Sequence, residues 1–203
     1  MIDYCRYYDL ELYLFEEVSP RFYRQGFIEA FDFFSIIIWK ANRAKSLIAK
    51  KLLRAGAPEK SLDIVCRRLS CAIHDASSDE ERFLLLFNAP WNFALPMASA
   101  ILTVLYPDTF TVYDYRVCDE LADPEYQRLA NYSNPHKIWE GYSRFLAAVE
   151  SSSSAPGLRN KDRFLIGRSL ATQLEGDIMS LFHIESDGST SETTQADCRG
   201  GIS

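Results

Sequence analysis

Residues 95–117, "LPMASAILTVLYPDTFTVYDYRV", contain the pattern that decides how the chain folds. The segment "MASAILTVLY" (97–106) is almost entirely small or apolar, which is typical of a helix that is buried on all sides. "PDTF" (107–110) has the composition of a turn. Asp114 in "VYDYRV" (112–117) comes directly before a second helical segment, where an aspartate can accept the first free backbone amides. The stretch therefore predicts two helices joined by a short loop, with a carboxylate at the junction.

The same periodicity argument extends outward in both directions and predicts about eight helices and little strand. Residues 3–18 fit either a helix or a strand. Helices are expected over 26–40 with a continuation to 56, and over 61–76, 77–87, 97–106, 115–122, 125–132, 136–150 and 158–179. Serines followed by acids at 77–81 are a typical helix N-terminus. The expected fold is all-α: one compact multi-helix domain over residues 1–184, followed by a disordered acidic tail over 185–203, which lacks apolar residues to bury.

Charge is distributed unevenly along the chain. The formal net charge is −6, and residues 185–203 contribute four acids and one base to it. Residues 40–54 are the exception, with six bases and no acid between them: Lys40, Arg43, Lys45, Lys50, Lys51 and Arg54. A local basic patch of this kind can bind phosphates even on an acidic protein. A solvated helix face is the competing interpretation.

Five cysteines without a CxxC pair favour reduced thiols and a cytoplasmic protein over a disulfide framework or a zinc site. The three histidines have no metal-ligand spacing, so no metal and no cofactor are expected. The first 30 residues are too polar for a signal peptide. Apolar runs are far shorter than a membrane span, so no membrane association is expected.

Four motifs occur in a characteristic order: Trp39-Lys40-x-x-Arg43; "ASAIL" (98–102) followed by Pro107, Asp114 and Arg116; Trp139-x-x-Tyr142; and Arg159-x-x-Asp162-Arg163. In this order they resemble the helix-hairpin-helix superfamily of base-excision DNA glycosylases, and within it a bacterial branch similar to the 8-oxoguanine glycosylases. The resemblance covers roughly residues 25–175. It implies a helical fold, DNA as the partner, and cleavage of the bond between a flipped base and its sugar.

The resemblance also assigns residues to roles. It implies that Asp114 is catalytic and stabilises an oxocarbenium-like transition state or activates water. It places the hairpin at 92–96, so that Asn92, Phe93, Ala94 and Leu95 would contact DNA, together with Lys40, Arg43, Lys45 and Arg116. Pro96 falls near the position of the family's nucleophilic lysine, which implies a monofunctional enzyme without lyase activity. The cysteine spacing does not fit an iron–sulfur cluster.

The hairpin departs from the family pattern, which has glycines at the positions of Asn92 and Ala94. Asparagine tolerates a positive φ, whereas an alanine in that conformation would be strained.

Several alternatives remain open at this level. Asp114 can be an ordinary N-cap. Arg116 can pair with Asp119 or Glu120 on its own helix. Trp39 can be a core residue or a stacking platform for a base, and Asp162 can belong to a local ion-pair cluster or be a second active-site carboxylate. The alternative function is a catalytically inactive module that keeps the fold and binds DNA or a protein.

Overall fold

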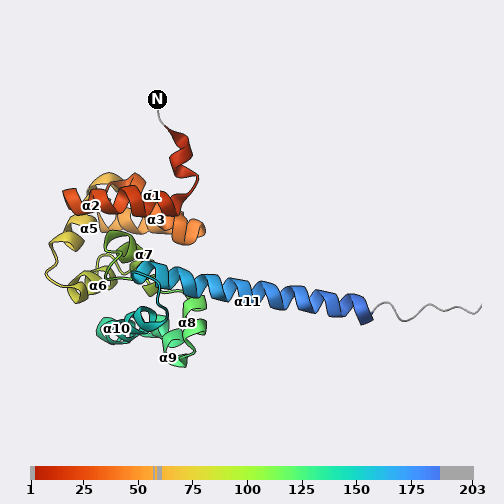
Figure 1. Cartoon of the computed structure of the whole chain (residues 1–203). Helices are drawn as coiled ribbons and strands as arrows, with labels where there is room; N and C mark the ends of the chain where they lie inside the picture. The colour runs from red at the N-terminus through yellow and green to blue at the C-terminus, as the bar shows by residue number, and fades with distance from the viewer. Residues whose placement is uncertain (1–2, 57, 59–60, 188–203) are drawn as a thin grey trace, which may run out of the picture.

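The computed structural model describes residues 3–56, 58 and 61–187 of the chain. All regular elements in these ranges are helices, which pack into one compact body from which α11 projects (Figure 1). The predicted all-α class is therefore confirmed for the described part of the chain. The elements are η1 (Tyr4–Tyr7), α1 (Leu10–Tyr13), η2 (Leu14–Val18), α2 (Ser19–Gln25), α3 (Ala30–Ala41), η3 (Asn42–Ala44), α4 (Lys45–Ala55), α5 (Leu62–Asp75), α6 (Asp79–Phe87), α7 (Leu95–Leu105), α8 (Tyr115–Leu121), α9 (Pro124–Arg128), η4 (Leu129–Asn131), α10 (Pro135–Ser151) and α11 (Leu158–Asp187).

The N-terminal segment, for which helix and strand were both open, is helical from η1 to α2. Asp3 and Asp9 accept backbone amides at the starts of η1 and α1, so each short helix begins at an acidic cap. Gly26 ends α2 with a φ of 76°, a left-handed conformation that glycine adopts without strain.

The expected continuous helix from residue 26 to residue 56 is wrong in two respects. First, α3 begins only at Ala30, because Gly26 ends the preceding helix. Second, the helix is interrupted at η3, where Ala41 leaves helical geometry with φ −160° and ψ 80°. Beyond the interruption α4 packs on α5 as well as on α3, and its buried residues are Ile48 and Leu52.

Helix α7 lies at the centre of the fold, as its sequence predicts. Ten of its residues are buried, and it packs against α3, α6 and α2. Its two buried polar side chains are satisfied: Thr103 donates to the Ser99 carbonyl at 2.7 Å, and Ser99 accepts from the Tyr113 amide at 2.9 Å. The second bond fixes the loop that leads to α8 onto the helix that precedes it.

The C-terminal third forms α10 and α11. The predicted apolar side of α10 is confirmed, with Ile138, Tyr142, Phe145 and Val149 buried and Leu146 packed against the core. Helix α11 continues to Asp187, so residues 185–187, which were assigned to the tail, are helical. The remainder of the expected disordered tail, 188–203, lies outside the described residues. Among the described helices, none is both long enough and apolar enough to cross a bilayer.

Candidate functional site

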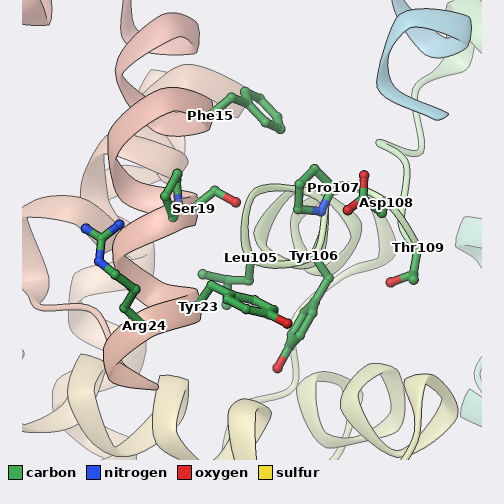
Figure 2. A pocket seen from close by; sticks show the side chains of 10 residues that line it. Phe15, Ser19, Tyr23, Arg24, Leu105, Tyr106, Pro107, Asp108 and Thr109 are labelled. Atoms are coloured by element: carbon green, nitrogen blue, oxygen red, sulfur yellow. The ribbon is translucent and has the colours of Figure 1, made fainter. Parts of the chain in front are cut away.

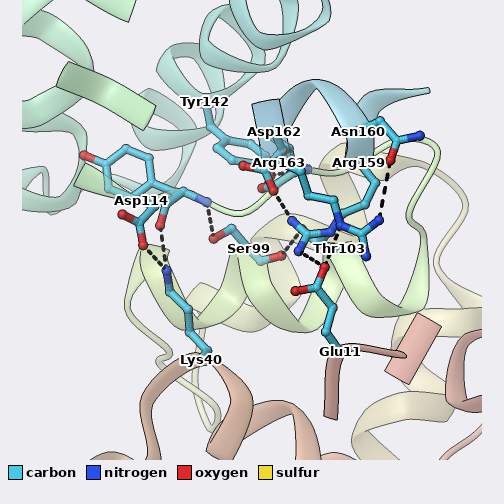
Figure 3. Close-up of polar contacts among 12 residues, drawn as sticks. Glu11, Lys40, Ser99, Thr103, Asp114, Tyr142, Arg159, Asn160, Asp162 and Arg163 are labelled. Atoms are coloured by element: carbon cyan, nitrogen blue, oxygen red, sulfur yellow. Dashed lines mark hydrogen bonds and ion pairs between the residues drawn. The ribbon is translucent and has the colours of Figure 1, made fainter. Parts of the chain in front are cut away.

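Asp114 lies at the end of the loop that joins α7 to α8, where it has two roles at once. Its Oδ1 accepts the backbone amide of Arg116 at 3.1 Å and so caps α8. Its Oδ2 accepts Nζ of Lys40, from the last turn of α3, at 2.8 Å. Figure 3 shows the Lys40 side chain extending from α3 to this carboxylate. The N-cap interpretation is thus confirmed, and the cap is also part of an ion pair between distant segments.

The loop that carries Asp114 is rigid because its backbone is bonded to buried side chains. The Tyr142 hydroxyl accepts a hydrogen bond from the Thr111 amide at 3.2 Å and donates one to the Thr111 carbonyl. The Ser99 hydroxyl accepts a hydrogen bond from the amide of Tyr113. Residues 110–113 are buried as a result. The carboxylate therefore stands on a backbone that is held in one conformation from both sides.

The electrostatic environment keeps Asp114 ionised. Burial alone would raise the pKa of its carboxyl group, because a low-dielectric environment disfavours charge. The hydrogen bond and charge of Lys40, with the amide of Arg116, outweigh burial and hold the pKa of Asp114 below its ordinary value. The side chains of Lys40 and Asp114 remain 14% and 21% exposed, so the pair is reachable from solvent.

Beside this ion pair is a pocket of about 210 Å³. Four chain segments build its wall, which consists of Glu11, Trp39, Lys40, Val112, Asp114, Arg159 and Ile166. Trp39 is half-buried and packs edge-to-face on Phe15, so the core interpretation of this residue holds in part, and the residue also lines the pocket. The volume is below the roughly 300 Å³ at which small-molecule pockets usually begin. It therefore suits a single ring system better than a whole nucleotide.

A second ion-pair group lies on the α11 side of the pocket (Figure 3). Arg159 donates to Asp162 and, at 2.6 Å, to Glu11, and its guanidinium stacks over the rings of Phe15 and Trp39. The local Arg159–Asp162 pair that the sequence indicates is confirmed. Glu11 is a residue that sequence reasoning missed, because it lies 148 positions from its partner and has no motif around it.

Two atoms of this group have no hydrogen-bond partner among the described residues: Nε of Arg159 and Oδ1 of Asp162. The Asp162 side chain is fully buried, and burial raises the pKa of its carboxyl to about 6 even though Arg159 acts in the opposite direction. The pKa of Glu11 is lowered, because Arg159 and Arg163 outweigh the effect of its burial. Asp162 lies behind the pocket wall and is not part of its lining.

The expected DNA-contacting hairpin has a different geometry from the one its resemblance implies. Asn92 does adopt a positive φ of 46°, but Ala94 has a φ of −77°, so the strain expected at Ala94 is absent. The amides of Asn92 and Phe93 donate to the carbonyls of Asn88 and Leu86, and the side chains of Phe93 and Leu95 are buried. Leu95 and Pro96 already belong to the first turn of α7.

The predicted basic residues are divided between two places. Lys40 forms an ion pair with Asp114, whereas Arg43 and Lys45 are exposed on η3 and α4 and do not line the pocket.

Lys51 donates to the Asn92 carbonyl and lies 5.4 Å from the centre of the Phe93 ring. It lines a separate cavity of about 480 Å³ with Lys50, Arg54 and Asn92. Arg116 stacks over Tyr115, and within the described residues it forms neither of the ion pairs that the sequence leaves open, with Asp119 or with Glu120.

A further cavity of about 600 Å³ lies between η2–α2 and the end of α7 (Figure 2). Phe15 and Tyr23 line one side and Tyr106 to Thr109 the other. Phe15 also lies under the guanidinium of Arg159, which lines the Asp114 pocket. In the part of the chain that is described, no group of three or more acidic, histidine or cysteine side chains is placed to hold a metal ion.

Comparison of the chain with protein-family models, with curated proteins and with solved structures gave no match. The resemblance to glycosylases rests on the order of motifs in the sequence alone.

Proposed function

We propose that this protein is a monofunctional DNA glycosylase that hydrolyses the N-glycosidic bond of a flipped damaged or modified base. One observation carries the proposal: an ionised carboxylate, Asp114, is fixed on a rigid loop at the wall of a ring-sized pocket that is also lined by an indole, Trp39. The volume supports entry of the base alone, with the sugar left at the mouth of the pocket near the carboxylate.

The chemistry follows from charge. As the bond between base and sugar breaks, positive charge develops on the sugar ring, and a fixed carboxylate lowers the energy of that state. Asp114 is held ionised by Lys40, so it is ready for this role without a proton transfer. Water adds to C1′ and gives up a proton, and the base leaves with a proton. Flipping the base costs a few kcal/mol, which stacking on an aromatic ring such as Trp39 offsets in part.

The leaving base gains negative charge, and Arg159 is suited to stabilise it. The guanidinium lines the same pocket as Asp114, and it already donates to Glu11 and Asp162. Glu11, Asp162 and two aromatic rings hold the group in place, so its orientation is fixed before a base enters. The pocket therefore offers a negative charge for the sugar and a positive charge for the departing base.

The decisive experiment compares wild-type protein with an Asp114→Asn variant on a panel of duplexes and single strands that each contain one modified base. Abasic sites are then revealed by alkali. Asparagine is as good an N-cap as aspartate, so the variant keeps the α8 cap and loses the charge, together with the ion pair to Lys40. We expect the wild type to release one class of base and the variant to lose this activity by at least about a hundredfold.

Asp123→Asn is the matched control. Asp123 caps α9 with the same geometry, accepting the Glu125 amide at 2.9 Å, and it is not part of the pocket wall. Equal activity of wild type and Asp123→Asn, with loss in Asp114→Asn, would separate catalysis from capping. Equal activity in all three proteins would remove Asp114 from the mechanism.

A second candidate is a binding module without catalysis, and a specific observation favours it. Arg43, Lys45, Lys50, Lys51 and Arg54 form no ion pair within the described residues, which leaves these charges on η3 and α4 available for phosphates. If no base is released from any substrate, the protein should still bind DNA. The double variant Lys50→Gln/Arg54→Gln should then bind DNA more weakly than the wild type, whereas the control variant Lys137→Gln should bind it equally well. Each lost phosphate contact should also reduce the salt dependence of binding by about one counterion.

A further inference from the structure

The cavity between η2–α2 and the end of α7 takes no part in the proposed catalysis. Its lining and that of the Asp114 pocket have no residue in common. Its volume of about 600 Å³ lies within the range of roughly 300–1,000 Å³ that is usual for small-molecule sites. The cavity can therefore hold a molecule larger than a single ring system.

Three aromatic side chains line this cavity: Phe15, Tyr23 and Tyr106. The Tyr23 side chain is 80% exposed, and Figure 2 shows its ring extending from α2 towards Tyr106. The Tyr106 ring is held in place, because it packs edge-to-face on Phe22 and lies under the guanidinium of Arg82. An exposed ring beside a fixed one offers a platform on which a planar ligand can stack.

The polar side chains around the cavity have no partner within the protein. Among the described residues, no hydrogen bond or ion pair involves the side chains of Ser19, Tyr23, Arg24, Asp108 or Thr109. Ser19 is buried, whereas the other four are exposed and have access to water. A few polar groups that converge on a mostly apolar cavity are typical of a ligand site.

The charges of the lining are separated. Arg24 belongs to α2, and Asp108 belongs to the loop that follows α7. Figure 2 shows the Arg24 side chain directed away from Asp108. The C-terminal end of α7, an 11-residue helix, adds partial negative charge on the Asp108 side. The lining therefore suits a ligand with a flat ring in the middle, hydrogen-bond donors at one end and an anion at the other.

A purine nucleotide has these three features in this order. Its base can stack on tyrosine rings, an amino group on the base can donate to a carboxylate, and its phosphate can pair with a guanidinium. An aromatic amino acid fits less well, because its ammonium and carboxylate groups are attached to the same carbon atom. Inorganic phosphate would leave the aromatic rings unused.

We propose that this cavity binds a purine nucleotide, with the base against Tyr23 and Tyr106. The amino group of the base donates to Asp108, and the phosphate pairs with Arg24. A free nucleotide and a nucleotide within a single strand share this chemistry. The site is additional to the Asp114 pocket and does not depend on cleavage of a base there.

Isothermal titration calorimetry of the full chain with adenosine 5′-monophosphate and guanosine 5′-monophosphate tests the binding of free nucleotides. Two further ligands separate the contacts: ribose 5-phosphate lacks the base, and purine riboside 5′-monophosphate lacks the amino group. Both should bind more weakly than the two nucleotides. Equal binding of ribose 5-phosphate would show that the rings are not used and would overturn the proposal.

Variants of the lining test the location of the site. Tyr23→Ala should weaken nucleotide binding by about tenfold, because a stacked ring is lost. Asp108→Ala and Arg24→Gln should also weaken it. Tyr8→Ala and Arg128→Gln are the matched controls, because both side chains are exposed and neither lines the cavity. The controls should bind like the wild type, and equal binding by Tyr23→Ala and Tyr8→Ala would overturn the proposal.

A short single-stranded oligonucleotide of purines distinguishes the two sources of the nucleotide. Binding of the strand but not of the free nucleotides, weakened in Tyr23→Ala relative to Tyr8→Ala, would assign the cavity to a strand. Binding of the free nucleotides with the same dependence on Tyr23 would assign it to a soluble ligand. No binding of either at millimolar concentration would overturn the proposal, and circular dichroism establishes that each variant is folded.

Discussion

Replacement of Asp162 by asparagine should remove a pH dependence from the stability of this protein. The carboxyl is fully buried, and burial raises its pKa to about 6 from an ordinary 3.8 in the unfolded chain. Between these two values the folded state binds more protons than the unfolded state, so the free energy of unfolding falls as the pH rises. Below pH 3.8 the stabilising effect of the protonated form is fully present, and it is lost as the pH passes through 6.

The magnitude follows from the difference between the two pKa values. A difference of about two units corresponds to about 3 kcal/mol over the whole range. Roughly 2 kcal/mol of this should appear between pH 4 and pH 7, since the unfolded carboxyl is already partly ionised at pH 4. Glu11 and Asp114, whose pKa values are lowered, act in the opposite direction and lose stabilisation at acid pH. They are present in both proteins, so the main part of their contribution cancels in the difference between the two curves.

The assay is urea denaturation of wild type and Asp162→Asn at half-unit steps from pH 4 to pH 8. The wild type should lose about 2 kcal/mol relative to the variant between pH 4 and pH 7. Asp177→Asn, an exposed carboxylate on the same helix, should give a curve parallel to that of the wild type. Parallel curves for wild type and Asp162→Asn would refute the claim that the buried carboxyl takes up a proton near pH 6.

Four further predictions concern packing, helix propensity, capping and a buried network, each measured by thermal or urea denaturation. Gly141→Ala on α10 should destabilise by about 1–3 kcal/mol, because an added Cβ would lie 2.1 Å from Cδ2 of the buried Leu129. Gly167→Ala on α11 meets no neighbour and should instead stabilise by up to about 1 kcal/mol, and a loss of stability there would contradict the described open face. Ser78→Ala should cost about 1 kcal/mol, since the hydroxyl accepts the Glu81 amide at 3.2 Å, and an unchanged midpoint would show that the cap is dispensable. Asp32→Ala should cost about 2 kcal/mol, because a tyrosine hydroxyl and an arginine each donate to Asp32 at 2.6 Å and would lose their acceptor. A smaller loss of stability than that of Ser78→Ala would indicate that water replaces the lost carboxylate.

The helices that the sequence predicts best are those whose patterns are set locally. The run of small and apolar residues at 97–106 is typical of a buried helix, which α7 is. Ser78 indicates the start of α6, because its side chain accepts the backbone amide three residues further on. The interruption at η3 has no comparable signal, because the basic and apolar residues on both sides continue at helical spacing. Helix α4 packs on α5, and tertiary packing of that kind is not encoded in periodicity.

The candidate pocket is predictable only in part, for a related reason. The Lys40 and Asp114 positions stand out as motifs, but their ion pair joins residues 74 positions apart. Arg159 and Asp162 are visible as neighbours on one helix, whereas Glu11 is one acid among several in a segment that fits two kinds of structure. Local pattern identifies which side chains carry charge, and only the folded chain determines which of them meet.

The contact between Glu11 and Arg159 also sets the order in which the pocket is completed during synthesis. The two residues are 148 positions apart, so at about 5–20 residues per second the ribosome reaches the second roughly 7–30 s after the first. From the addition of Trp39 until the end of that interval, the nascent chain carries Glu11 and Trp39 without the arginine that contacts them both. A chain released before α11 is made would have most of its core and an open-sided cavity in place of the pocket.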